Sequence, residues 1–189
     1  MLENEIKQAL ESHFSARRSD KKELLFLEEL RLSGGAARAD LVNVETMHCY
    51  EIKSEKDSLK RLVSQGSRYI RVFDQITLVT AETHLDLALK IIPSWWGIIL
   101  VPSSADDSFV EVRQAGRNPK LVPSQLAKVL TKQECLDFLS GQGLVRGKKS
   151  LSLYRLQEFL VETFSLEKLK EVVVNALQLR VHALSEVTA

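Results

Sequence analysis

The order of strand-like and helical segments between residues 75 and 114 most constrains the fold. Residues 75–80 read as a buried strand, and residues 97–101 read as a strand of consecutive aliphatic residues. Residues 85–92 have helical spacing, and residues 109–114 alternate like a further strand. Strands that alternate with helices predict a sheet whose faces are covered by helices, rather than a sandwich or a helix bundle. The fold class that we predict is therefore α/β.

The chain divides into three regions by the kind of segment that each contains. Apolar residues at helical spacing predict a helix in residues 1–19, and the strands and helices of the core occupy residues 20–118. After them, residues 119–189 contain helical segments. We therefore expect an N-terminal helix, an α/β core and a helical C-terminal extension.

A second helix is expected at the start of the core. Leucines recur at short spacing between Asp20, which is suited to cap a helix, and the flexible residues 33–35. The predicted helix carries two glutamates, Glu28 and Glu29, near its end.

Residues 38–44 and 47–53 read as the two strands of a β-hairpin. If residues 45 and 46 form a two-residue turn, the strand register places Asp40 directly opposite Glu51. A longer loop or a bulge remains an alternative, because a Glu-Thr turn lacks the residues favoured in tight hairpins. Facing carboxylates destabilise a sheet unless a cation or a proton lies between them, and a divalent metal ion is the obvious candidate.

The hairpin also supplies the other groups that phosphodiester hydrolysis requires. Asp40, Glu51 and the backbone carbonyl of Ile52 are hard oxygen ligands suited to Mg²⁺ or Mn²⁺. Lys53 is placed to assist the attacking water and to stabilise charge that develops on the phosphate. We therefore predict a metal-dependent phosphodiester hydrolase.

A strand Asp40, then Glu51-Ile52-Lys53 on the next strand, then a helix, resembles the PD-(D/E)xK nuclease superfamily. Gln65 and Tyr69 in that helix fit the Gln-x-x-x-Tyr element of some members, and the whole is similar to a little-characterised bacterial branch. The resemblance implies a restriction-endonuclease-like core, in which helices flank a mixed sheet, and nuclease activity on DNA.

The resemblance also implies further residues of the site. An upstream glutamate, Glu28 or Glu29, would complete the metal site. Gln65 and Tyr69 would position the substrate or Lys53.

Cations gather on the segment that follows the motif. The four expected to contact nucleic acid are Lys56, Lys60, Arg61 and Arg68. Contacts with the phosphate backbone dominate nucleic-acid affinity, so a local basic patch beside the site favours DNA as the partner. For any single cation, an exposed helix face that binds nothing is the alternative.

The amino-acid composition excludes several classes of protein. With 44% hydrophobic and 27% charged residues, the chain is neither disordered nor fibrous, and its net charge of +1 is too small to indicate a polyanion partner by itself. Cys49 and Cys135 form no CxxC pair, which argues against a disulfide scaffold or structural zinc and favours the cytoplasm. The longest apolar stretches fall short of a membrane span, so no membrane partner is expected.

Two alternatives stay open at this point. Asp40, Glu51 and Lys53 could belong to a solvated hairpin face that holds one Glu–Lys ion pair. The protein could also be a catalytically inactive nuclease-fold module that binds nucleic acid or a protein partner. A homodimer is left open as well.

Overall fold

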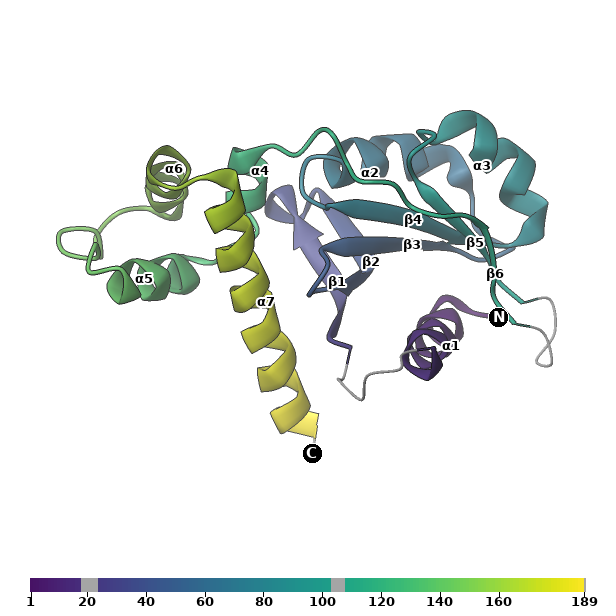
Figure 1. Ribbon diagram of the computed structural model, residues 1–189, viewed down its shortest axis with the longest axis horizontal. Coiled ribbons are helices and arrows are strands. Elements are labelled where there is room, and N and C mark those ends of the chain that lie inside the picture. Colours follow the sequence, from purple (N-terminus) through teal and green to yellow (C-terminus); the bar gives the residue numbers. More distant parts are fainter. Residues whose placement is uncertain (18–23, 103–107, 189) are drawn as a thin grey trace.

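The computed structural model describes residues 1–17, 24–102 and 108–188 (Figure 1). Within these residues a six-stranded mixed sheet is flanked by helices, which confirms the predicted α/β class. The strands are β1 (Phe26–Leu32), β2 (Ala37–Asn43), β3 (His48–Lys53), β4 (Gln75–Thr80), β5 (Gly97–Leu100) and β6 (Val110–Arg113). The helices are α1 (Glu3–Ala16), α2 (Leu62–Tyr69), α3 (Leu85–Ile91), α4 (Pro123–Ala127), α5 (Lys132–Gly141), α6 (Leu153–Thr163) and α7 (Leu166–Thr188). Three short 3-10 turns are η1 (Ser33–Gly35), η2 (Leu59–Arg61) and η3 (Glu82–His84).

The strands lie in the sheet in chain order, from β1 to β6. β1, β2 and β3 form an antiparallel meander, and β3, β4 and β5 are parallel because helices connect them. β6 returns antiparallel to β5 at the far edge. The carboxyl ends of the three parallel strands therefore meet at one edge of the sheet, directly after Lys53 in β3.

Helices cover both faces of the sheet. In Figure 1, α2 and α3 lie on one face, α1 lies on the other, and α4 to α7 gather beyond the β1 end. Helix α1 is seated by Ile6 and Leu10, which are buried in a cluster with Leu41, Ile52 and Val79. The opposite face joins the main core, which continues into the C-terminal helices. The part of the sheet that β2 and β3 form thus lies between two packed layers.

The helix predicted between Asp20 and Leu30 is wrong. Residues 26–32 form strand β1, and Asp20 lies outside the described residues. Leu27 and Leu30 face the same core although they are three positions apart, because Glu29 between them has a left-handed backbone with φ 58°. That interruption shifts the two-residue alternation of the strand by one position, and it imitates the three-residue spacing of a helix.

The predicted hairpin and its register are confirmed. β2 pairs antiparallel with β3, and Val42 lies opposite Cys49, which is the predicted register. The connection is the longer alternative, because four residues, 44–47, separate the ends of the two strands. The Met47 amide donates to the Val44 carbonyl at 3.4 Å, and the Asn43 side chain accepts from the Thr46 amide at 3.2 Å and so supports this turn.

The C-terminal helices begin and end at signals visible in the sequence. Thr131 and Glu134 form the predicted capping box of α5, and Ser165 separates α6 from α7. Arg180 of α7 donates to Glu134 at 2.6 Å and to the Val129 carbonyl at 2.9 Å, which ties the last helix to α5. None of the described helices combines the length and the apolar character needed to cross a bilayer.

Candidate metal centre

The sheet places three carboxylates in one row across neighbouring strands. β1 and β2 pair regularly on both sides of Glu29, which therefore lies opposite Asp40. Leu41 pairs with Tyr50, so the same β2–β3 register, continued by one residue, places Asp40 opposite Glu51. Each strand of the meander thus contributes one acidic residue to a row that crosses the three strands, with Asp40 in the middle.

Asp40 is buried and binds the backbone of the neighbouring strand. Its Oδ2 accepts a hydrogen bond from the Ile52 amide at 2.8 Å, where a ladder bond between the strands would otherwise lie. Burial raises the pKa of Asp40 from 3.8 to about 7, and the nearby Glu51 adds to the rise. Without a metal ion, burial therefore favours the neutral form of Asp40 at pH values where an ordinary aspartate is ionised.

Glu51 has no exposed surface, and both of its carboxylate oxygens have partners. Lys53 Nζ donates to Glu51 Oε1 at 2.5 Å, and it lies 4.0 Å from Asp40 Oδ2. The Tyr69 hydroxyl lies 2.7 Å from Glu51 Oε2 and 2.7 Å from the Arg38 carbonyl. Glu51 is therefore held between a lysine and a tyrosine.

The lysine of this group is charged at neutral pH. Burial lowers the pKa of Lys53, but Glu51 and then Asp40 outweigh it and hold that pKa above its ordinary value. Gln65, the other residue of the predicted Gln-x-x-x-Tyr element, donates to the Tyr69 hydroxyl at 3.5 Å. Tyr69 therefore contacts Glu51 directly, and Gln65 contacts the site only through the Tyr69 hydroxyl.

Helix α1 contributes an acidic residue that the sequence analysis missed. Oxygen atoms of Glu3, Glu29 and Asp40 all lie within 4.8 Å of one another, a spacing that one cation can bridge. Of the two upstream glutamates that were predicted as alternatives, Glu29 belongs to this group, whereas Glu28 is half exposed on the neighbouring position. The Ile52 carbonyl, a further predicted ligand, accepts from Lys53 Nζ at 3.1 Å.

Two cationic side chains contact the carboxylates of this group. Lys7 of α1 donates a hydrogen bond to Glu29 and lies 3.0 Å from Glu3 Oε1. Burial opposes its charge, but the bonds to Glu29 and Glu3 hold the pKa of Lys7 well above its ordinary value. Arg38 forms an ion pair with the other oxygen of Glu29. The signal for Lys7 and Glu3 was their four-residue spacing, which puts both on one side of the helix.

The donor set fits a hard divalent cation. Carboxylate oxygens are the ligands that Mg²⁺ and Mn²⁺ prefer, and three of them converge from β1, β2 and α1. Both oxygens of Glu29 face cations, Oε1 facing Lys7 and Oε2 facing Arg38, so this carboxylate lies where positive charge is bound. The left-handed backbone of Glu29 is a further cost that a functional position can retain.

The predicted nucleic-acid contacts lie on the segment that carries Tyr69. Lys56, Lys60 and Arg61 are exposed ahead of and along the start of α2, and Arg68 is partly buried. One Arg68 guanidinium nitrogen donates to the Ser64 carbonyl at 3.0 Å, so this side chain is partly committed to its own helix. Lys56, Lys60 and Arg61 thus lie ahead of α2, and only Arg68 is on the helix whose C-terminal residue, Tyr69, contacts Glu51.

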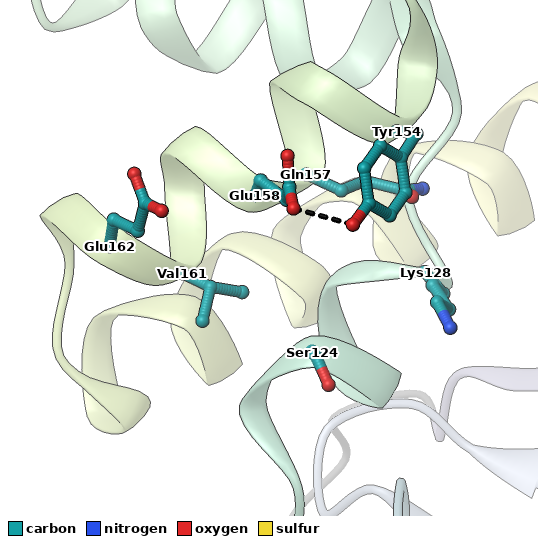
Figure 2. A pocket seen from close by; sticks show the side chains of 7 residues that line it. All are labelled: Ser124, Lys128, Tyr154, Gln157, Glu158, Val161 and Glu162. Carbon is teal, nitrogen blue, oxygen red and sulfur yellow. Dashed lines mark hydrogen bonds between the residues drawn. The ribbon is translucent and has the colours of Figure 1, made fainter.

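Another pocket lies apart from these residues. It lies between α4 and α6 and has a volume of about 230 Å³. Figure 2 shows the side chains around it, among them Tyr154, whose hydroxyl donates to Glu158. None of its residues belongs to the group of described carboxylates that can share a cation.

The raised pKa of Asp40 predicts how stability changes with pH. The folded protein keeps a proton that the unfolded chain releases, so the free energy of unfolding should fall as pH rises from about 3.8 to about 7. Asp40→Asn removes this titration, and the metal-free wild type should lose about 1–3 kcal/mol more than the variant over that range. Urea unfolding of both proteins at several pH values measures the difference. Parallel pH profiles would show that Asp40 ionises as freely as in the unfolded chain.

A sequence comparison identifies the relatives of this chain. The sequence model of the bacteriophage P4 protein cII family matches residues 1–188. The chain belongs to the bacteriophage P4 protein cII family. Protein cII of Enterobacteria phage P4 is 29% identical over 192 residues, which cover 98% of this chain and 70% of the phage protein. A solved structure, a protein of unknown function from Silicibacter pomeroyi, has a TM-score of 0.45 and 16% identity, and the match covers 78% of this chain and 92% of that chain.

The family match corrects the resemblance seen in the sequence. Assignment to the PD-(D/E)xK nuclease superfamily is wrong, because nearly the whole of this cII-family chain is matched and no such nuclease family is indicated. An Asp followed by Glu-x-Lys on the next strand is a short pattern that arises often by chance. The functional roles of Asp40, Glu51 and Lys53 therefore rest on the geometry of these residues in the structure.

Proposed function

We propose that this protein is a metal-dependent phosphodiester hydrolase that acts on DNA. The observation that carries the proposal is the position of Asp40, a buried carboxylate between two groups. On one side, Glu3 and Glu29 bring oxygens within reach of a shared cation. On the other side, Lys53 Nζ lies 4.0 Å from Asp40 Oδ2 and donates a hydrogen bond to Glu51. A cation site and a fixed ammonium group thus lie side by side.

In this proposal Asp40, Glu29 and Glu3 hold Mg²⁺ or Mn²⁺, and Glu51 and the Ile52 carbonyl stay predicted ligands. When bound, such an ion supplies a Lewis acid that polarises a phosphoryl oxygen and acidifies a water. Lys53, which is charged, stabilises the negative charge that develops on the phosphate and orients the water, rather than taking its proton. Tyr69 fixes Glu51, and Glu51 fixes Lys53.

The finer fold assignment is part of the same proposal. A restriction-endonuclease-like core is supported by the order of elements: a helix, a three-stranded meander, a helix, and a strand parallel to the third. DNA as the substrate is supported by the exposed cations Lys56, Lys60 and Arg61 on the segment that leads into the site.

One observation favours a second candidate, a module that binds nucleic acid or protein without turnover. Glu3 and Glu29 already contact Lys7, and Glu51 already contacts Lys53. Internal ion pairs of this kind can neutralise a row of carboxylates without any metal ion. Under this alternative the same residues are structural.

A cleavage screen separates the two candidates. Linear, circular, single-stranded and branched DNA, and RNA, would be incubated with Mg²⁺ or Mn²⁺ and either the wild type or Asp40→Asn. We expect the wild type to cleave at least one substrate and the variant to cleave none. Equal cleavage by both would point to a contaminant, and binding of a substrate without cleavage would support the module.

The basic segment makes a separate prediction about binding. Replacing Lys60 and Arg61 together with alanine should weaken DNA binding, and it should reduce the slope of log affinity against log salt by about 1–2. The matched control replaces Arg146 and Lys149, two exposed cations of the C-terminal extension, and should leave the slope unchanged. Fluorescence anisotropy in a salt series measures both. An unchanged slope in the first variant would place the DNA on another surface.

A further inference from the structure

Lys7 is the most deeply buried cation of the candidate metal centre. Its side chain is 2% exposed, although it lies on the first helix of the chain. Ile6 and Leu10 on either side of it pack into the sheet, so the helix carries the ammonium group into the acidic cluster. There Nζ contacts Glu29 and lies 3.0 Å from Glu3 and 3.3 Å from Glu28.

Two of these three carboxylates are the ones that converge with Asp40. Glu3 and Glu29 therefore serve both as partners of Lys7 and as candidate ligands of a divalent ion. A metal ion that binds their oxygens would lie a few ångströms from the ammonium group, where like charges repel strongly in a partly buried setting. Lys7 already contacts oxygen atoms of Glu3 and Glu29, so a metal ion that takes these oxygens as ligands has to displace the ammonium group from them.

We propose that Lys7 is a built-in counter-cation that competes with the divalent ion for Glu3 and Glu29. The inference rests on the proposed function and concerns the regulation of the same site. Metal binding expels the Lys7 ammonium group from the cluster, and in the metal-free protein Lys7 neutralises the carboxylates that the metal ion would bind. Metal affinity is thereby lowered.

The exposure of the carboxylates agrees with such an exchange. The Glu3 and Glu29 side chains are 41% and 35% exposed, so an ion can reach them from solvent while Lys7 holds them from within. Arg38, on the other oxygen of Glu29, is 60% exposed and free to move away. Helix α1 packs on the sheet through Ile6 and Leu10, and this packing does not involve the ammonium group. Metal binding therefore leaves the contact between the helix and the sheet in place.

Lys7→Met tests the competition, because methionine keeps most of the aliphatic length and removes the charge. Isothermal titration of the full chain with Mn²⁺ should show a dissociation constant lower than that of the wild type by about tenfold or more. Lys7→Arg keeps the charge and should stay close to the wild type. The matched control is Lys170→Met, which removes another partly buried lysine, paired with Asp74 in a separate place, and should change nothing.

Each outcome decides the question. Equal or weaker Mn²⁺ binding by Lys7→Met, with normal binding by the wild type, would overturn the competition and leave the metal site standing. No Mn²⁺ binding by either protein would overturn both. If Lys7→Met does not fold, amine labelling of the wild type gives the answer. Mn²⁺ should make Lys7 several-fold more reactive while exposed Lys56 stays constant, and unchanged Lys7 labelling would contradict the proposal.

Discussion

Lys53→Met should slow metal-dependent cleavage by about two to three orders of magnitude, because it removes a fixed positive charge next to the reacting phosphate. Lys53 is held within 2.5 Å of Glu51 and 4.0 Å of Asp40, so its ammonium group needs no rearrangement when charge develops. Single-turnover cleavage at saturating Mn²⁺, on the substrate that the screen identifies, measures the effect. Saturating metal separates a loss of chemistry from a loss of metal binding.

The control for this variant is Lys149→Met, which removes an exposed lysine of the C-terminal extension. It should retain most of the single-turnover rate, since it lies outside the contacts around Asp40. Circular dichroism must show that Lys53→Met is folded, because the change leaves Glu51 without its cation. A folded Lys53→Met with the wild-type rate would remove Lys53 from the mechanism.

Glu51→Gln should lower the free energy of unfolding by about 3–5 kcal/mol, because it leaves a buried ammonium group without its closest counter-charge. Glu51 has no exposed surface, and Lys53 is 14% exposed, so water cannot replace the lost interaction. The glutamine still offers an oxygen to the Tyr69 hydroxyl, which isolates the effect of charge. Urea unfolding at constant pH without metal measures the difference.

Glu158→Gln provides the comparison for an exposed pair. Glu158 contacts Arg155 at 2.8 Å on the surface of α6, where solvent screens such a pair. Its loss should therefore change stability little. A loss below about 1 kcal/mol in Glu51→Gln as well would mean that Lys53 finds enough stabilisation from Asp40 and solvent.

Local patterns in the sequence predicted most of the sheet. The run at residues 75–80 is β4, and the β2–β3 register followed from the length of the turn. Both depend on interactions between neighbours in sequence, such as apolar runs and hairpin geometry. Strand β1 was missed because Glu29 shifts its alternation, and only pairing with β2 makes such a backbone stable.

The candidate site was harder to predict from the sequence than the fold. Asp40, Glu51 and Lys53 come together because they lie on one hairpin, whereas Glu3 and Lys7 reach the same place only through the docking of α1. No local spacing links residue 3 to residue 40, so this part of the site depends on tertiary packing. The short Asp and Glu-x-Lys pattern also led to the wrong superfamily, since it carries little information without the rest of the chain.

The central claim is that Asp40 and its neighbours hold a divalent cation, and thermal melting with Mn²⁺ tests it most directly. An ion that binds the folded protein alone stabilises it by about 2.7 kcal/mol at a hundredfold excess over its dissociation constant. The wild type should therefore melt at a clearly higher temperature with several millimolar Mn²⁺. Asp40→Asn, without the ion, should melt at or above the wild type, because it relieves the repulsion with Glu51, and Mn²⁺ should hardly change it. Equal shifts in the two proteins, or none in the wild type, would contradict a metal centre at Asp40.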